Sequence, residues 1–567
     1  MTSRVLKNKL NPTFGLFRST LRKNLGVIVL LAVAMLILCP GLFLTTLPNV
    51  KREDVIPDNP MYLEILFGLC GFASCAFVAI GNFISFSFLY KKNSSDVFCS
   101  LPLTGTGLFI ARAAASFVTV AIPLTLGYVS LFTLTAFYPA YLLGTFTQIL
   151  SAYLVNLLCM LFVSGFVLIF IVCAGSAFDL IISFFGFNAA VSVIGFIIAN
   201  LSSGYLSGFS DESISGIMKS MSPMAYCLAS ALEFAGSDGS TPYSLAGNIG
   251  FILITLCVTA AFFAAAILLF IHRKTERGGQ AYAYKFIYVI CSILAGICGG
   301  YILSAIFSLA GEEKPMSFIG IISFIPGALL TVTVYGAVTD RGFKKFKKSL
   351  VYGAVSVAAY LVILAVIMNG AFGFSNRIPQ RGDVIYAEII CGDAVINLDE
   401  SAPVIALHKA IIDKDANDFD KSELSSPHDS VRIRYKLKGG GEMLREYYAD
   451  MDKVGDEVFK VLNADERFDD YLETVEKLST DSFEADLCGD DESYDCIGTK
   501  KQLKEFIKAY REDFSRYGKQ IVYGQDEMII SVFSKQKEGD EYLFEIKLTD
   551  DFTETLSVLD GFNRIEY

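Results

Sequence analysis

Residues with strong catalytic chemistry are sparse in this chain of 567 residues, and their spacing predicts no enzyme. The three histidines, His272, His408 and His428, stand too far apart in the sequence to indicate a His-rich metal site. No stretch matches GxxxxGK[ST], the loop that holds nucleotide phosphates in many ATPases. We therefore expect no catalytic residue, no cofactor and no metal in this chain, and we interpret His272 and His408 as structural or surface residues.

The segment DKDANDFDKSEL (413–424) has the acidic spacing of a calcium-binding loop but lacks two decisive residues. Position 6 is Asp418, where such loops need glycine for a sharp turn. Position 12 is Leu424, where they need a bidentate glutamate. We interpret the segment as a solvated acidic turn.

The cysteines allow one redox prediction, which stays open. Ten of the 13 lie in the apolar part of the chain, where cysteine behaves as a small hydrophobic residue. The others are Cys391, Cys488 and Cys496. In LCGDDESYDC, Cys488 and Cys496 form a disulfide if the domain is exported to an oxidising space, and otherwise stay free thiols.

The elements that position these residues are mainly predicted membrane spans. Hydrophobic residues make up 53% of the chain, which is too apolar for a soluble enzyme of this length. A helix needs about 20 apolar residues to cross ~30 Å of hydrocarbon. Nine stretches meet this requirement: 26–46, 61–89, 113–137, 147–174, 180–203, 248–271, 286–309, 316–337 and 350–373. We expect a polytopic α-helical protein of the cell membrane.

The distribution of Lys and Arg predicts the orientation, because positive charges near span ends are retained in the cytoplasm. With the N-terminus inside, the predicted cytoplasmic segments hold 18 Lys and Arg, and the opposite connections hold four. An odd number of spans then places residues after 374 outside the cytoplasm.

The tail after residue 374 differs in composition from the rest. It holds 44 acidic and 25 basic residues, whereas residues 1–374 hold 14 and 22. The acidity of the chain therefore belongs to an extracytoplasmic domain and indicates no nucleic-acid partner. Period-2 patterns predict strands, and helical spacing predicts helices. The predicted strands are 384–391, 431–438, 527–533 and 542–549, and the predicted helices are 402–412, 454–462 and 500–514. A hairpin is expected at Gly439–Gly441, so the tail (375–567) is predicted to be α+β.

Two segments on the predicted cytoplasmic side have the composition of binding elements. The first, VLKNKLNPTFGLFRSTLRKNLG (5–26), predicts an interfacial amphipathic helix within residues 1–24. A plain basic retention tail is the alternative. The apolar face of the helix holds Phe14, Phe17 and Leu21, and the basic face holds Arg18, Arg22 and Lys23.

The second segment, SSDVFCSLPLTGTGLF (94–109), connects the second and third predicted spans. Ser95 or Asp96 is expected to cap a short helix, which Pro102 ends. We expect apolar contacts to a partner from Leu101, Pro102, Leu103 and Phe109, with Asp96 and Ser100 setting the orientation. An ordinary polar loop is the alternative.

These two segments, together with LYKKNSSDVFCSLPLTGTGLFIAR (89–112), resemble the permeases of ABC-2 type transporters, especially the Firmicute kind with extra spans and an outer domain. SPMAYCL (222–228) is similar to the re-entrant region of that family, and RKTERGGQAYAYK (273–285) to related permeases with extra spans. The resemblance implies a six-span core at 25–272 and three additional spans at 273–374. The Arg or Lys that the family often carries near Thr104–Thr106 is absent here.

The resemblance implies that segment 94–109 docks on a separate cytoplasmic ATPase subunit. The chain is then a permease that pairs with a second permease subunit, identical or different, in contact with membrane lipid. The apolar span interiors, with scattered Ser, Thr and Asn, favour an amphipathic, peptide or lipid-like cargo over an ion. The alternative is a membrane receptor whose outer domain binds an extracellular ligand, although nine spans exceed what an anchor needs.

Overall fold

The computed structural model divides the chain into two units, which we call the helical unit and the sheet unit. The helical unit comprises Met1–Ile197 and Gly216–Leu361, and the sheet unit comprises Ile198–Ser215 and Val362–Tyr567. The structure describes residues 2–41, 44, 61–137, 146–210, 212–214, 217, 222–226, 249–280, 282–310, 318–343, 346–391, 394–398, 401–417, 430–438, 442–463, 465–477, 482–488, 493–519, 528–536, 539–549, 551–559 and 561–564.

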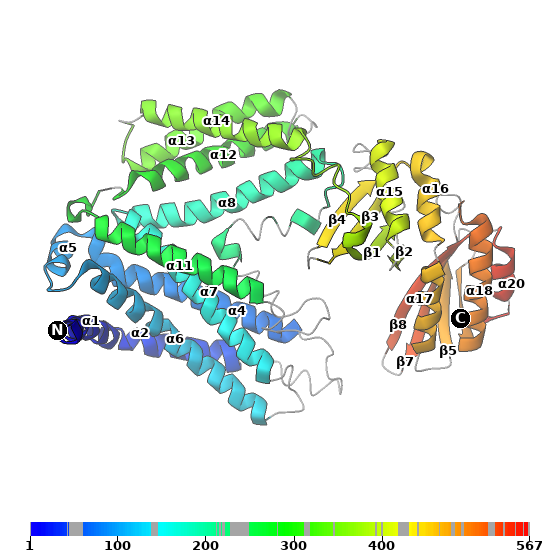
Figure 1. Ribbon diagram of the computed structural model, residues 1–567, viewed down its shortest axis with the longest axis horizontal. Coiled ribbons are helices and arrows are strands. Elements are labelled where there is room, and N and C mark those ends of the chain that lie inside the picture. The colour runs from blue at the N-terminus through cyan, green and yellow to red at the C-terminus, as the bar shows by residue number, and fades with distance from the viewer. Residues whose placement is uncertain are drawn as a thin grey trace. The chain divides into compact units, whose positions relative to one another are not determined.

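The helical unit is built from long apolar helices that run side by side (Figure 1). Eight are long and apolar enough to cross a membrane: Gly68–Tyr90, Gly105–Leu134, Ile149–Cys173, Ala177–Tyr205, Ile249–His272, Lys285–Leu309, Ile319–Thr339 and Phe346–Met368. The helices that contain them are α4 (Met61–Phe86), α6 (Gly105–Phe137), α7 (Phe146–Cys173), α8 (Ala177–Tyr205), α11 (Ile249–His272), α12 (Lys285–Ala310), α13 (Phe318–Thr339) and α14 (Phe346–Met368). Eight of the nine predicted spans thus correspond to long apolar helices.

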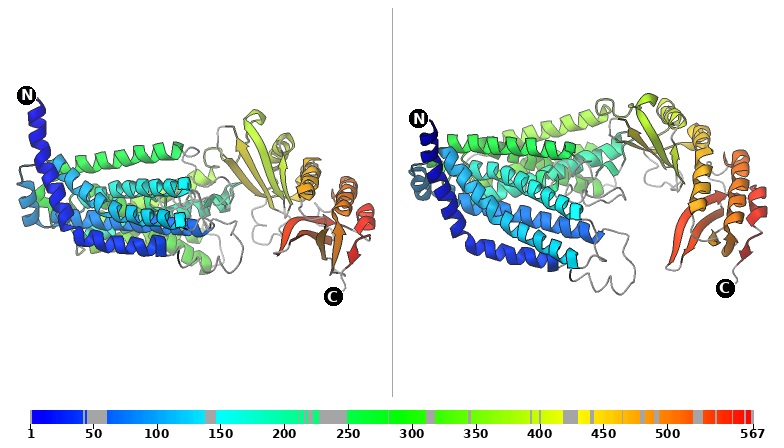
Figure 2. Two further views of the ribbon diagram at one scale, coloured as in Figure 1. Left: turned by 90° about the horizontal axis from the view of Figure 1, so that it is seen from below. Right: turned by 60° about the horizontal axis from the view of Figure 1, so that its bottom comes forward.

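The first predicted span, 26–46, differs from the other eight. Helix α2 (Leu25–Leu36) and the π-helical segment Ile37–Gly41 are long enough to cross a membrane only when they are taken together with the preceding helix. That helix, α1 (Thr2–Lys23), meets α2 at a bend of 58° (Figure 2). The bend falls at Asn24, whose side chain donates a hydrogen bond to Thr119 Oγ1 on α6 at 3.3 Å. In the described part of the chain, eight helices are therefore long and apolar enough to cross a membrane, or nine if the bent pair counts as one.

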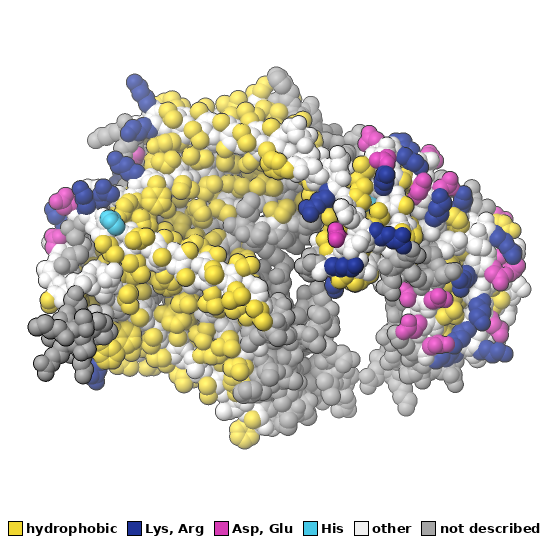
Figure 3. All heavy atoms as spheres, viewed as in Figure 1, with side chains coloured by type: hydrophobic (Ala, Val, Ile, Leu, Met, Phe, Trp, Pro, Cys, Tyr) yellow, Lys and Arg dark blue, Asp and Glu magenta, His cyan; other side chains and the backbone are white. Residues whose placement is uncertain are grey.

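Helix α7 lies at the centre of the helical unit. In an apolar stretch of 18 residues, 78% of α7 is buried, whereas 17% of the corresponding stretch of α11 is buried. Polar side chains bridge the helices, as when Asn82 on α4 donates to Ser164 on α7 at 2.8 Å. Because packing cannot rely on the hydrophobic effect in lipid, such links between helices contribute to association there. Hydrophobic side chains cover the flank of this unit, and Lys and Arg gather at one end (Figure 3).

The sheet unit holds two antiparallel sheets. The first has the order β2-β1-β3-β4 and the second the order β8-β7-β5-β6-β9. The strands are β1 (Val384–Cys391), β2 (Ala394–Leu398), β3 (Ser430–Leu437), β4 (Glu442–Tyr448), β5 (Ser482–Cys488), β6 (Ser493–Thr499), β7 (Met528–Gln536), β8 (Gly539–Leu548) and β9 (Asn563–Arg564). The helices are α15 (Ala402–Asp413), α16 (Met451–Leu462), α17 (Asp465–Lys477), α18 (Lys500–Tyr517) and α20 (Thr553–Leu559). One apolar core joins these elements, which confirms the α+β prediction for the tail.

Local sequence explains these elements well. On α18, Leu503, Phe506, Ile507 and Tyr510 are buried on one face, as the helical spacing predicted. Thr499 and Gln502 form a capping box at the start of this helix. Strands β3 and β4 pair as a hairpin, with Lys436 opposite Glu442, although the three glycines between them lie outside the described residues.

The strand register excludes a disulfide between Cys488 and Cys496. Cys488 lies opposite Ser493, whereas Cys496 lies opposite Ala485, three positions along the same ladder. At about 3.4 Å per residue, the two Cα atoms are about 10 Å apart, which exceeds the roughly 7 Å that a disulfide spans. The register of these two strands therefore does not fit the disulfide alternative.

Candidate functional site

The loop predicted to bind a partner forms a short helix and a turn between α4 and α6. Helix α5 (Lys92–Cys99) begins after Lys91, whose backbone is extended, and has no side-chain cap at its start. The prediction that Ser95 or Asp96 caps this helix is therefore wrong, since both lie inside α5. The helix ends where Ser100 Oγ donates to the carbonyl of Val97 at 2.9 Å, and the turn before α6 contains Pro102.

Two arginines from other parts of the chain lie near α5. The guanidinium of Arg112 on α6 lies 4.4 Å from the ring centroid of Phe98 and donates to the carbonyl of Ser85 at 3.0 Å. Arg273, which follows α11, donates to the carbonyls of Val172 at 2.6 Å and Leu89 at 3.0 Å. Arg112 thus links α5 to α4 and α6, and Arg273 links the end of α11 to α7 and to the turn before α5.

The structure separates the predicted partner contacts into an exposed and a buried group. Asp96, Ser100 and Pro102 are exposed, and Leu101 and Leu103 are half-buried. Phe109 is 1% exposed and packs against Phe86 and Phe270 with both ring centroids at 5.4 Å. It belongs to the core, which corrects the prediction that it contacts a partner.

Sequence reasoning missed Val97, the most prominent apolar side chain of α5. Val97 is 62% exposed, although it lies between the exposed Asp96 and the half-buried Phe98. Its position directly after the polar run Lys92–Asp96 was the available signal. Behind α5, a cavity of about 230 Å³ is lined by Ser95, Leu103 and Arg273, among others. The exposed face of α5 therefore combines one apolar side chain with polar neighbours.

The predicted interfacial helix lies beside the same end of α6. A Cβ placed on Gly107, in the first turn of α6, would come within 2.9 Å of Thr13 Oγ1 on α1. Thr20 of α1 is buried, and Leu16, Phe17 and Leu21 are half-buried. The first turns of α6 thus bring together the two elements that the sequence singled out.

The outward face of α1 carries an exposed aromatic residue and three exposed cations. Phe14 is 64% exposed and stacks on Phe17 with the ring centroids 6.0 Å apart. Arg18, Arg22 and Lys23 are exposed. An exposed aromatic side chain beside exposed cations is typical of a helix at a membrane surface.

A second feature, which we call the junction, joins the ends of two long helices to the first sheet within the sheet unit. It consists of residues 206–214 after α8, residues 370–377 after α14, and the facing side chains of β3 and β4. The two carboxylate oxygens of Glu212 accept from Arg432 at 2.9 Å and from Arg434 at 3.0 Å. Ser210 donates to Glu446 at 2.8 Å. These contacts attach the end of α8 to the sheet.

The end of α14 is attached through an arginine. The guanidinium of Arg445 lies 3.9 Å from the ring centroid of Phe374 and donates to its carbonyl at 3.2 Å. Gly208 has a positive φ of 76°, and a Cβ there would lie 2.6 Å from the hydroxyl of Tyr447. Glycine is therefore required at this close approach. Sequence reasoning missed the junction because its ion pairs join residues about 220 positions apart.

Buried polar groups beneath the junction have a structural arrangement. His408 is fully buried, with Nε2 2.7 Å from the hydroxyl of Tyr447 and Nδ1 3.1 Å from that of Tyr435. Burial, with a further contribution from the positive charge of Arg445, lowers the pKa of His408 to about 4. The ring is neutral at physiological pH, as expected for a structural histidine. Within the described ranges, no group of three or more His, Cys, Asp or Glu residues is arranged to hold a metal ion.

Searches of protein-family models, curated proteins and solved structures find no match to this chain. Sequence pattern and local geometry therefore carry the functional argument.

Proposed function

We propose that this chain is the membrane-spanning permease subunit of an ATP-driven transporter of the ABC-2 type, with ATP hydrolysed by a separate cytoplasmic subunit. The observation that carries the proposal is α5, a short helix with the exposed residues Val97 and Asp96, whose Phe98 packs against the guanidinium of Arg112 on α6. A helix so placed is suited to enter a cleft on a partner.

In this proposal, the chain pairs with a second permease, identical or different, and each binds one ATPase subunit through α5. Closure of the two ATPase subunits on nucleotide pushes α5. The arginine bonds pass the displacement to α4, α6, α7 and α11. The helices then rock to open a path for an amphipathic, peptide or lipid-like cargo. The end of the helical unit at which Lys and Arg gather supports a cytoplasmic location for α5 (Figure 3).

Co-purification tests the proposal. The full chain is purified in mild detergent from its native membranes, and ATP hydrolysis and P-loop proteins are measured in the eluate. Val97→Glu should remove the ATPase, because it places a charge at the centre of the apolar contact. Phe343→Glu is the matched control, since Phe343 is an exposed apolar residue of the connection between α13 and α14. Its side chain is 72% exposed, compared with 62% for Val97. An ATPase that persists with Val97→Glu, or is lost equally with Phe343→Glu, contradicts the assigned role of α5.

A membrane receptor is the second candidate, and the junction is the observation that favours it. Its ion pairs give a ligand bound by the sheet unit a direct mechanical connection to the ends of α8 and α14. A wild-type preparation without any ATPase in several mild detergents would favour this function. The search would then move to ligands of the sheet unit.

A further inference from the structure

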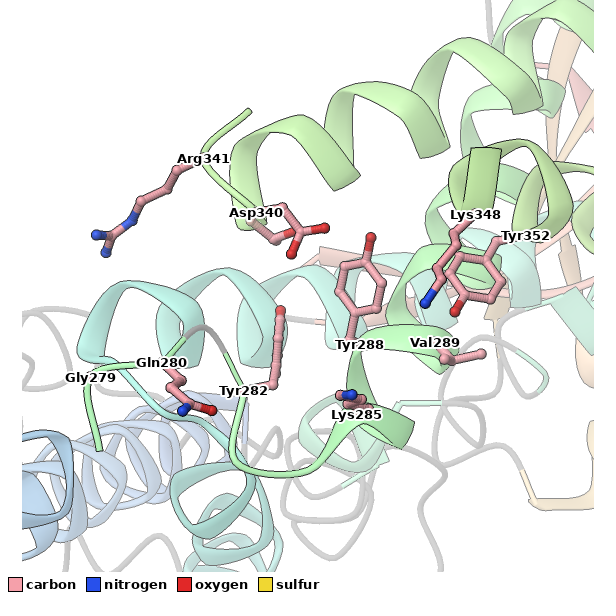
Figure 4. A pocket seen from close by; sticks show the side chains of 11 residues that line it. Gly279, Gln280, Tyr282, Lys285, Tyr288, Val289, Asp340, Arg341, Lys348 and Tyr352 are labelled. Carbon is pink, nitrogen blue, oxygen red and sulfur yellow. The ribbon is translucent and has the colours of Figure 1, made fainter. Parts of the chain in front are cut away.

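A cavity of about 410 Å³ lies at one end of α12, α13 and α14, within the helical unit (Figure 4). Three cationic side chains, Lys285, Arg341 and Lys348, and one carboxylate, Asp340, contribute to its lining. The lining therefore carries an excess of positive charge. In the described part of the chain, no carboxylate forms a salt bridge with Lys285 or Lys348, although the charge of Arg341 acts on nearby Asp179.

Backbone placement strengthens the positive potential of the cavity. Lys285 is the first residue of α12, and Lys348 lies in the first turn of α14. Two helix N-termini, with their free N–H groups and positive partial charge, thus lie beside the cavity. A phosphate group is the ligand chemistry that this combination favours.

Tyrosines form the remainder of the polar wall. The ring of Tyr288 lies between those of Tyr335 and Tyr352, with centroids at 5.9 and 6.0 Å. The ammonium of Lys348 points from α14 into the space beside Tyr288 and Tyr352 (Figure 4). Tyrosine and lysine at the ends of apolar helices are typical of the headgroup level of a bilayer. The cavity lies where the candidate spans 285–309 and 346–368 begin and the candidate span 319–339 ends.

A second cavity lies among the apolar parts of α8, α12 and α13. Its volume is about 450 Å³. Small side chains create it, including Gly186 and Ala189 on α8 and Ala295 and Gly299 on α12. No charged side chain lines it.

The two cavities share a face of α12. Tyr288 lines the first, and Ala295, Gly299 and Ile302 line the second. Their spacing of seven, four and three residues places them on one side of a helix. From Tyr288 to Ala295 the rise along the axis is about 10 Å. The basic cavity and the apolar groove thus lie on the same side of α12, about two turns apart.

We infer that the two cavities bind one anionic membrane phospholipid, with its phosphate between Lys285 and Lys348 and an acyl chain in the groove. The groove favours a lipid over free phosphate, because only a lipid fills both cavities. This inference does not depend on the proposed transport function, because it rests only on the lining of the two cavities and needs no ATPase partner.

Native mass spectrometry of the delipidated full chain tests the inference. Phosphatidylglycerol, phosphatidylcholine and inorganic phosphate are the three probes. Phosphatidylglycerol should form a one-to-one adduct that phosphatidylcholine and inorganic phosphate do not displace. The double variant Lys285→Ala/Lys348→Ala should weaken this adduct by at least about tenfold, because it removes two charge-assisted contacts to phosphate. Lys274→Ala/Lys347→Ala is the matched control. Lys274 lies in the connection before α12, and Lys347 lies in the first turn of α14. Both lysines are exposed, and neither lines the cavity.

A variant of the groove separates a lipid from a soluble anion. Ala189 is exposed, so Ala189→Phe fills the groove without displacing a packed side chain. We expect it to weaken phosphatidylglycerol binding while the melting temperature stays unchanged. Normal binding by Ala189→Phe, displacement by inorganic phosphate, or an equal loss in the control double variant would each overturn the inference.

Discussion

Protonation of His408 should destabilise the sheet unit in acid. The neutral ring lies between two buried tyrosine hydroxyls, and Arg445 opposes a second positive charge there. The pKa of His408 is about 4 in the folded chain, compared with about 6.5 for an unperturbed histidine. The unfolded chain therefore binds more protons below pH 6.5. Stability is fully present above that pH and falls as the pH decreases toward 4.

The expected magnitude follows from this difference in pKa. About 2.5 pKa units at 1.36 kcal/mol each give a loss of about 3 kcal/mol between pH 7 and pH 4. His408→Gln removes the titrating group and keeps a polar side chain. The variant should be less stable than the wild type at pH 7, while the acid-dependent loss becomes smaller by up to about 3 kcal/mol.

Hydrogen exchange of α15, β3 and β4 in the full detergent-solubilised chain measures this effect from pH 7 to pH 4, after correction for the intrinsic pH dependence of exchange. His272→Gln is the control, because His272 is exposed at the end of α11 in the other unit. Its acid dependence should equal that of the wild type. If His408→Gln shows the same acid dependence as the wild type, the argument from the buried neutral ring is refuted.

Three further perturbations probe the junction, α5 and the thiols. Gly208→Ala should destabilise the junction by about 1 to 3 kcal/mol, because it forces a side chain into a positive-φ position against Tyr447. Hydrogen exchange in residues 206–210 should therefore become faster, and an unchanged rate would refute this prediction. Arg112→Gln should accelerate hydrogen exchange in α5 by about tenfold, since a partly buried cation–π contact contributes about 1 to 2 kcal/mol. Exchange at the wild-type rate would show that this contact does not stabilise α5. Mass spectrometry of the unreduced chain should find no peptide cross-linked through both Cys488 and Cys496, and such a peptide would contradict the strand register.

Periodicity made the elements predictable where one face of each is buried. The strand predicted at 384–391 has the observed bounds of β1, and the long apolar helices follow the predicted spans closely. The first span was the least well predicted. Hydropathy does not predict a bend. The bend falls at Asn24, whose side chain contacts Thr119 on α6.

The candidate site was predictable in location but not in the roles of its residues. The Pro- and Gly-broken segment at 94–109 does form a short exposed helix and turn. Which side chains face outward depends on tertiary packing, and therefore Phe109 was misplaced and Val97 missed. The junction was out of reach, because nothing in the local pattern of Glu212 indicates its pairing with Arg432 and Arg434.

A photo-crosslinking experiment tests the proposed permease function most directly. A benzophenone amino acid replaces Val97 in the full chain, and the membranes are irradiated before solubilisation. The account predicts a covalent adduct with a P-loop ATPase, which the same amino acid at position 343 does not form. Irradiation that captures no ATPase at position 97, or captures it equally at both positions, would contradict the assignment of α5 as the site of coupling.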